Sequence, residues 1–213
     1  YGISRSKTDL NIKQVQCDFN DTQHLAIALN ELIDTKQIDI VILNAGTLGS
    51  ISKTNHLRLD EFYDVFTVNV LSNKIIIDWL INHEVEMKHV VGRPFGSYES
   101  LSSVIGISSG AALKSYYGWS LYCSSKAAFK QLISGYAIEH PDIKFLSIAP
   151  GVVKTKMQDK IYSINEEDVP SVKKFKDMYD TMDTPDIVAK KLIEHLPTLI
   201  GDSNNYCDLR DIK

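Results

Sequence analysis

The chain has 213 residues, of which 44% are hydrophobic, and this is enough to build the core of one domain of ordinary size. Its net charge is −4 and its Lys and Arg residues are dispersed, so we expect neither a nucleic-acid partner nor a membrane partner. No apolar run approaches the roughly 18 residues that span a bilayer. The three cysteines, an odd number without metal-ligand spacing, indicate reduced thiols in a cytoplasmic protein that holds no metal.

The first part of the chain alternates short apolar runs with segments of helical periodicity. The longest run, residues 38–43, is almost continuously β-branched, which predicts a strand buried on both faces of a parallel sheet. It leads directly into Asn44, Ala45 and Gly46. The other elements expected before it are the end of a strand at residues 1–3, a strand at 15–18 and a helix at 22–35.

A second helix is expected from residue 59 to 66, continuing through Asn69 into the apolar run at 75–81. Asn inside a helix costs about 0.5 kcal/mol relative to Ala, so Asn69 has either a functional role or an exposed or capping position. Pro and Gly close together predict an inserted loop at residues 92–102. A mobile loop and a contact with a partner are both compatible with this insertion.

Residues 104–126 form the segment that carries chemistry. The apolar run 104–107 predicts a strand that ends at Ser108 and Ser109, and open α/β sheets bind ligands at the carboxyl ends of their strands. Tyr122 and Lys126 are four positions apart, so a helix places both on one face, where an ammonium lowers the pKa of a nearby phenol. Alone, a serine pair often caps a turn and Tyr-x-x-x-Lys often lies on a solvated helix face. Their combination therefore carries the argument.

The last third of the chain continues the alternation. We expect a strand at 144–149 that runs into Pro150 and Gly151, a helix that begins at Pro185, and a last strand at 205–209. Between them, the polar segment 156–182 contains scattered Met, Tyr and Phe residues, as a lid over a substrate would. The alternation predicts one α/β domain, residues 1–213, built on a doubly wound parallel sheet.

The segments Ile-Ser-Ser-Gly at 107–110 and Gly-Trp-Ser-Leu-Tyr-Cys-Ser-Ser-Lys-Ala-Ala at 118–128 resemble the active-site region of the short-chain dehydrogenases/reductases. The Gly-Trp-x-x-Tyr-Cys run is most similar to the sepiapterin reductase and benzil reductase group. The resemblance covers nearly the whole chain and implies a Rossmann-like fold. It also implies four catalytic residues: Tyr122 donates a proton, Ser109 hydrogen-bonds the substrate oxygen, Lys126 lowers the Tyr122 pKa and holds the ribose, and Asn69 distorts its helix to hold a water.

The resemblance further implies an NADP cofactor. Arg5 beside hydroxyl groups suits a 2′-phosphate, whereas an acidic residue there would select NAD; an exposed Arg in a turn is an equal alternative. Asp18 corresponds to a position beside the adenine, although it could equally cap the next helix, and Asn44 is expected to tie adjacent strands together. The residues implied in cofactor binding are Ser4, Arg5, Ser6, Asp18, Phe19, Asn44, Ala45, Gly46, Tyr122, Lys126, Pro150, Gly151, Val153 and Thr155.

One feature of the family is not found in this sequence. A dinucleotide-binding half begins with a strand, a Gly-x-x-x-Gly-x-Gly turn and a helix that holds the pyrophosphate, and no such turn occurs here. We therefore expect about thirty residues, the size of one such unit, to precede Tyr1 in the parent protein. The alternative is a fragment or a degenerate relative.

These observations predict an NADPH-dependent carbonyl reductase that acts on a small ketone or diketone held at Ser109. In sepiapterin reductases a carboxylate corresponding to Asp208 holds the pterin, although Asp208 could instead pair with Arg210 or cap the strand end. A benzil-like diketone would rely on Trp119 and Met157. The alternative function is a non-catalytic scaffold, and members of the family pair through the helices that contain residues 75–81 and 127–136, which predicts a homodimer or homotetramer.

Overall fold

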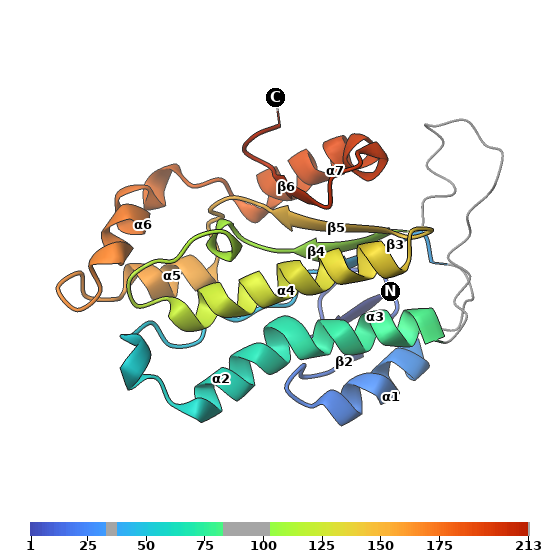
Figure 1. The fold of residues 1–213 in the computed structure, drawn as a ribbon, viewed down its shortest axis with the longest axis horizontal. Coiled ribbons are helices and arrows are strands. Elements are labelled where there is room, and N and C mark those ends of the chain that lie inside the picture. The colour runs from blue at the N-terminus through green and yellow to red at the C-terminus, as the bar shows by residue number, and fades with distance from the viewer. Residues whose placement is uncertain (33–37, 83–102, 213) are drawn as a thin grey trace.

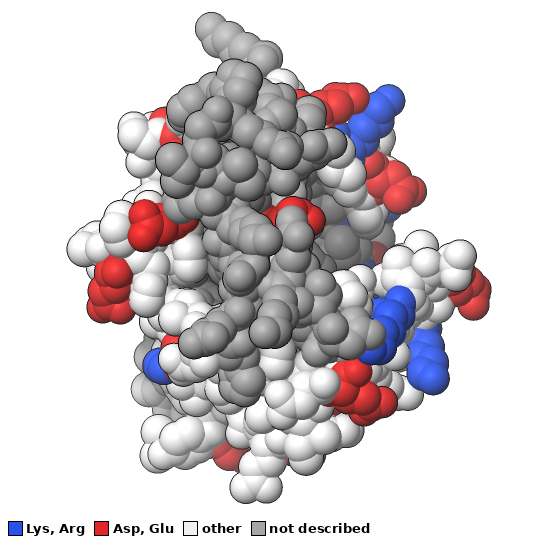
Figure 2. Space-filling view, turned by 90° about the vertical axis from the view of Figure 1, so that its right-hand side faces the viewer, with Lys and Arg blue, Asp and Glu red and all other residues white. Residues whose placement is uncertain are grey.

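The computed structural model describes residues 1–32, 38–82 and 103–212. The insertion predicted at 92–102 lies outside the described residues. None of the helices in the described ranges is both long enough and apolar enough to cross a membrane. On the face drawn in Figure 2, acidic and basic side chains of the described residues are interspersed, as the dispersed charges of the sequence predict.

The strands form two parallel sheets, with the Rossmann-like α/β arrangement expected from the sequence (Figure 1). In the smaller sheet, β1 (Gly2–Ser4) pairs with β2 (Gln14–Gln16). The larger sheet has the order β3-β4-β5-β6. Its strands are β3 (Ile40–Leu43), β4 (Ser103–Ile107), β5 (Lys144–Ala149) and β6 (Tyr206–Asp208). Because all these strands are parallel, their carboxyl ends meet at one edge of the sheet.

Helices cover both faces of the larger sheet. Figure 1 shows α3 and α4 on one side and α7 on the other. Val104 and Phe145 pack toward α4, whereas Ile105 and Leu146 pack toward α7, because successive side chains of a strand point to opposite faces. The helices are α1 (Thr22–Leu32), α2 (Leu59–Phe66), α3 (Ser72–Asn82), α4 (Ser120–Glu139), α5 (Lys156–Tyr162), α6 (Lys173–Asp177) and α7 (Pro185–Gly201).

Several single turns complete the chain. A π-helical turn, Thr67–Leu71, joins α2 to α3, so the long helix expected from residue 59 to 81 is present with a distortion at Asn69. In the described part of the chain, the 3₁₀ turns are Thr54–His56, Gly110–Ala112, Pro170–Val172 and Tyr179–Thr181. The predicted helix at 22–35 is described as far as Leu32, and the strand expected at 15–18 lies at Gln14–Gln16.

Helix α4 lies close against the sheet because β4 contains a glycine. A Cβ on Gly106 would lie 2.6 Å from Cζ of Phe129, which is closer than any real contact of this kind. Phe129 is buried and belongs to the core cluster between α4 and the sheet. The short distance between helix and strand places the Tyr122 end of α4 beside the carboxyl end of β4.

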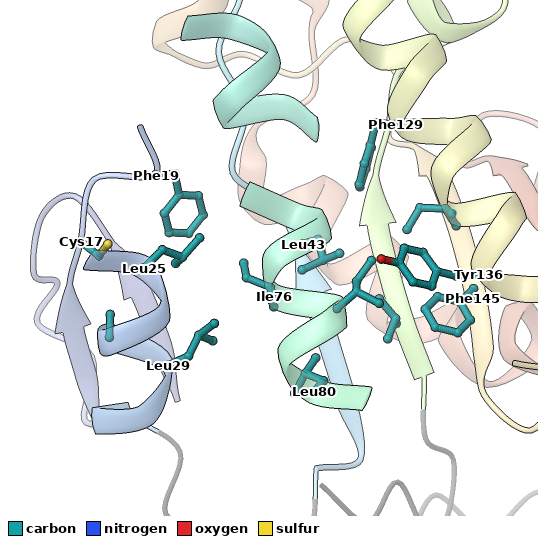
Figure 3. Close-up of a cluster of buried hydrophobic side chains, with 14 residues drawn as sticks. Cys17, Phe19, Leu25, Leu29, Leu43, Ile76, Leu80, Phe129, Tyr136 and Phe145 are labelled. Atoms are coloured by element: carbon teal, nitrogen blue, oxygen red, sulfur yellow. The ribbon is translucent and has the colours of Figure 1, made fainter. Parts of the chain in front are cut away.

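The expectation that strand 38–43 is buried on both faces is wrong. Ile40 is 37% exposed and Ile42 is 52% exposed, and both line a cavity of about 810 Å³ between the two sheets. Among the described residues, no strand joins β1 to β3, so one side of β3 lacks the cover that a central parallel strand needs. Figure 3 shows Leu25 and Leu29 of α1 facing Ile76 and Leu80 of α3 across this region.

Candidate functional site

The four residues predicted to be catalytic meet at the carboxyl end of β4. Ser109 follows the strand and begins the 3₁₀ turn that leads away from it, with its Oγ accepting a hydrogen bond from the Ala111 amide at 3.1 Å. The side chain of Tyr122 is hydrogen-bonded to Ser109. Nζ of Lys126 donates to the carbonyl of Ile107, the last residue of β4, at 2.9 Å. The structure thus brings together side chains that the sequence separates by up to 57 positions, from Asn69 to Lys126.

Burial controls the ionisation of Lys126. Its side chain is only 4% exposed, and the loss of solvent lowers its pKa from 10.5 to about 8. Its bond to the Ile107 carbonyl fixes the ammonium under the strand end. Lys126 is therefore still mainly protonated near neutral pH, and it loses its charge in the mildly alkaline range.

The pKa of Tyr122 is raised, which corrects the expectation that Lys126 lowers it. Burial is the largest cause, and the hydrogen bond with Ser109 acts in the opposite direction. The ammonium of Lys126 lies 5.9 Å from the centroid of the Tyr122 ring and donates to a backbone carbonyl. A phenol in this environment is neutral at ordinary pH, which is the form that can donate a proton.

Asn69 lies in the π-helical turn and is completely buried. Its Oδ1 accepts from the Thr47 amide at 2.7 Å, and its Nδ2 donates to the Thr47 carbonyl and to Ser125 Oγ, both at 2.9 Å. These bonds join the helix to the loop after β3 and to α4. The exposed and capping alternatives for Asn69 are thereby excluded.

Apart from Tyr122 and Lys126, the predicted cofactor residues form two groups. The first lines the cavity between the sheets, and the second surrounds the turn after β5. Ser6 stands apart from the cavity wall, where its carbonyl accepts from Ser4 Oγ at 2.6 Å. The residues of the first group on the cavity wall are Ser4, Arg5, Asp18, Phe19, Asn44, Ala45 and Gly46.

Two of these residues differ from the expectations. Asn44 is exposed in the cavity, and among the described residues its side chain makes no hydrogen bond to a neighbouring strand, so the expectation that it ties adjacent strands together is wrong. Asp18 accepts from the Asn20 amide at 3.0 Å within the preceding turn. The residue that caps α1 is Asp21, whose Oδ1 accepts from the His24 amide at 2.9 Å. The alternative that Asp18 caps this helix is therefore wrong.

The second group follows β5. Gly151 has a φ of +86°, which an L side chain rarely adopts, and it directs the chain away from Pro150. Val153 forms a parallel bridge with Asp183, and Thr155 is the exposed residue that precedes α5. This turn begins at the same edge of the sheet as Ser109, because β4 and β5 are neighbours.

The residues predicted to contact the substrate lie in different environments. Trp119 is only 4% exposed, its indole stacks on Phe175 at 4.9 Å, and its Nε1 donates to Ser171 Oγ at 2.9 Å. The segment 156–182 thus covers Trp119, and Trp119 anchors that segment to α4. Its indole therefore has no open surface for a substrate. Met157 is half-buried beside the same cluster.

The carboxylate of Asp208 is engaged by Arg210. Oδ1 accepts from Nε at 2.8 Å and from the Arg210 amide at 3.0 Å, and Oδ2 accepts from Nη2 at 2.5 Å. This is one of the alternatives that the sequence left open, and the pterin-binding role of Asp208 stays a prediction. Among the described residues, no three His, Cys, Asp or Glu side chains are grouped as metal ligands would be.

Sequence reasoning did not identify Thr47 and Ser125. Ser125 Oγ donates to the Tyr122 carbonyl at 2.9 Å and accepts from Asn69, so it links Asn69 to the backbone of α4. In the sequence, Ser125 could have been identified only by its position three residues after Tyr122. Thr47 could have been identified only by its position directly after Asn-Ala-Gly. Arg210 was noted only as a partner for Asp208.

Comparisons with known proteins show which family this chain resembles. Residues 4–166 match the family model for short chain dehydrogenases. A benzil reductase that forms (S)-benzoin, from Bacillus subtilis, is 28% identical over 210 residues, covering 92% of this chain and 82% of that protein. Sepiapterin reductase of Rattus norvegicus is 35% identical over 141 residues, covering 64% of this chain and 50% of that protein. A short-chain dehydrogenase/reductase structure from Saccharomyces cerevisiae superposes with a TM-score of 0.78 at 22% identity, covering 100% of this chain and 85% of that one.

Proposed function

Because the chain belongs to the short-chain dehydrogenase family and is an oxidoreductase of that family, we propose that it uses NADPH to reduce a ketone or 1,2-diketone. The observation that carries this proposal is the meeting of Ser109, Tyr122 and Lys126 at the carboxyl end of β4. This is the edge at which open parallel sheets bind ligands. A protein without a reaction to catalyse has no physical need to bury a lysine there.

The proposed reaction needs a hydride and a proton. The cofactor supplies the hydride to the carbonyl carbon when it is bound. Tyr122 donates the proton to the carbonyl oxygen as alkoxide charge develops, and Ser109 donates a hydrogen bond to the same oxygen. The raised pKa of Tyr122 keeps it protonated before the step. Lys126, charged below about pH 8, stabilises the tyrosinate that the step leaves behind.

The residues present fit a nicotinamide cofactor at both of its nucleoside ends. A Cβ on Gly46 would lie 3.3 Å from Nζ of Lys126 and 3.5 Å from Oδ1 of Asn69, so only glycine leaves space beside the lysine for a ribose. At the other end, Arg5 lines the cavity with Ser4, and a guanidinium among hydroxyls suits the 2′-phosphate of NADP. No residue of this chain is assigned to the pyrophosphate, because the Gly-rich turn is not found in the sequence.

The two named groups of relatives provide two candidate substrates. A pterin presents hydrogen-bond donors and needs a free carboxylate, whereas both oxygens of Asp208 already accept from Arg210. A benzil-like diketone presents only acceptors and apolar surface. The Asp208–Arg210 pair therefore favours the diketone over the pterin.

The experiment is to incubate the purified protein with NADPH and benzil, and separately with sepiapterin. We expect NADPH consumption matched by alcohol formation with benzil, and slower turnover with NADH. A protein that binds NADPH and benzil without consuming NADPH would contradict the proposal and favour the non-catalytic scaffold.

A further inference from the structure

Three strand ends converge on Arg210. Arg210 follows β6, Gly110 follows β4, and Gly151 follows β5. A Cβ on Gly110 would lie 3.5 Å from Nη2 of Arg210, and a Cβ on Gly151 would lie 3.3 Å from its Cδ. The arginine side chain therefore lies across two glycines that border the site described above. A Cβ would be in ordinary contact with it at Gly110 and in tight contact with it at Gly151.

Asp208 holds the guanidinium in one orientation. The pair is bidentate, through Nε at 2.8 Å and Nη2 at 2.5 Å, and the carboxylate side chain is only 11% exposed. The same carboxylate accepts from the Arg210 amide, which fixes the backbone of the turn. The arginine side chain is 57% exposed, and among the described residues Nη1 has no hydrogen-bond partner. A half-buried acid thus presents an accessible guanidinium, so the pair differs from an ordinary surface salt bridge.

The exposed guanidinium lies beside the proposed reaction centre. Gly110 is the residue directly after Ser109, whose hydroxyl is hydrogen-bonded to Tyr122. This position gives Arg210 no direct role in the transfer of the proton or the hydride. It offers a charged donor to whatever group lies next to the reacting carbonyl.

We propose that Arg210 is a specificity-determining residue that hydrogen-bonds a second oxygen on the carbon adjacent to the reacting ketone. The substrate class is accordingly a 1,2-dicarbonyl or an α-keto acid, and the inference rests on the proposed carbonyl reduction. A guanidinium forms strong, charge-assisted hydrogen bonds with carbonyl and carboxylate oxygens. Asp208 acts as a positioning residue, because it holds the guanidinium toward the strand ends.

The test compares two substrates that share one ketone. Phenylglyoxylate carries a carboxylate next to the ketone, and acetophenone carries a methyl group there. Replacing Arg210 with Met keeps the unbranched apolar stem of the side chain and removes the guanidinium donors. We expect Arg210→Met to lower kcat/KM for phenylglyoxylate by about tenfold or more, the scale of one charge-assisted hydrogen bond, and to change kcat/KM for acetophenone by less than about twofold.

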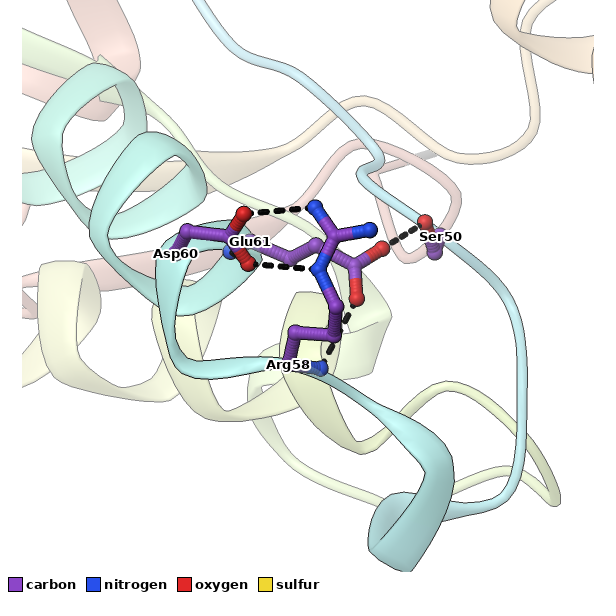
Figure 4. Close-up of polar contacts among 4 residues, drawn as sticks. All are labelled: Ser50, Arg58, Asp60 and Glu61. Atoms are coloured by element: carbon purple, nitrogen blue, oxygen red, sulfur yellow. Dashed lines mark hydrogen bonds and ion pairs between the residues drawn. The ribbon is translucent and has the colours of Figure 1, made fainter.

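The chain offers a matched control in Arg58 and Asp60. This pair has the same spacing and the same bidentate geometry, with Nε at 2.9 Å and Nη2 at 2.5 Å from the carboxylate, but both side chains are well exposed at the start of α2 (Figure 4). Arg58→Met should leave both substrates unaffected. Arg210→Lys, which keeps the charge but loses the bidentate pair, should recover only part of the activity on phenylglyoxylate.

The outcomes separate this inference from the proposed function. Equal losses on both substrates, or no loss on phenylglyoxylate, would overturn the role of Arg210, and urea unfolding of each variant shows whether a loss reflects folding. If the wild type reduces neither of these ketones nor benzil, the proposed function fails. In that case the affinity for phenylglyoxylate, measured by calorimetry, tests the role of Arg210 separately. Weaker binding by Arg210→Met than by the wild type supports this role, and equal binding refutes it.

Discussion

Replacing Asn69 with Ala should lower the free energy of unfolding by about 2 to 3 kcal/mol. The change removes three hydrogen bonds, to the Thr47 amide, the Thr47 carbonyl and Ser125 Oγ, at a net cost of roughly 1 kcal/mol each. Ala is the better helix former by about 0.5 kcal/mol, which offsets a small part of the loss. Urea unfolding with a constant m-value measures the difference.

Asn73 provides the matched control for this measurement. It lies one helical turn after Asn69 and is equally buried, but its side chain makes a single hydrogen bond, from Nδ2 to the Asn69 carbonyl at 3.0 Å. In the described part of the chain its Oδ1 has no partner, so Asn73→Ala also removes a buried unsatisfied acceptor. We expect Asn73→Ala to change the free energy of unfolding by less than about 1 kcal/mol. Equal losses in the two variants would refute the view that the bonds of Asn69 hold the loop, the π-helical turn and α4 together.

Three further predictions concern the cofactor end and the buried lysine. Arg5→Asp should reverse the preference for NADPH over NADH, because it removes a phosphate partner and adds an acceptor for a free 2′-hydroxyl. The ratio of kcat/KM for the two cofactors measures this preference. Lys7→Asp is the control, because it changes the charge by the same amount. The activity should fall as the pH rises through about 8, where Lys126 loses its charge. Lys126→Arg should move this fall to higher pH. An unchanged pH profile in the variant would contradict the role of Lys126 as the charged group that supports the proton transfer. Because the folded-state pKa of Lys126 lies below its ordinary 10.5, the same group makes the free energy of unfolding rise between about pH 8 and 10.5, a slope that Lys126→Met should remove in urea unfolding at several pH values.

Local patterns were sufficient to predict the strands and the longer helices, but not α5 and α6, which lie in the segment expected to be a polar lid. The β-branched runs and the Tyr122–Lys126 spacing depend on neighbours in sequence, and the structure has the corresponding elements close to the expected bounds. The exposure of Ile40 and Ile42 could not be predicted in this way, because it depends on which strand lies beside β3.

The electrostatics of the site also depend on tertiary contacts. Spacing on a helix brings Lys126 near Tyr122, but the pKa of Tyr122 is set by burial and by a hydroxyl that arrives from the end of β4. The partners of Asn69 come from 22 and 56 positions away. Sequence periodicity does not report such distant pairs, and it gave no reason to connect Asp208 and Arg210 with the edge near Ser109.

The most direct test of the proposed mechanism is the turnover of Tyr122→Phe. The variant keeps the buried ring and removes only the hydroxyl that is hydrogen-bonded to Ser109. Tyr117→Phe, which removes a hydroxyl from an exposed tyrosine in the preceding loop, is the control. We predict that Tyr122→Phe binds NADPH with nearly unchanged affinity but reduces ketones with a kcat lower by about a hundredfold or more, the scale of general acid catalysis. Wild-type turnover by Tyr122→Phe would contradict the assignment of Tyr122 as the proton donor.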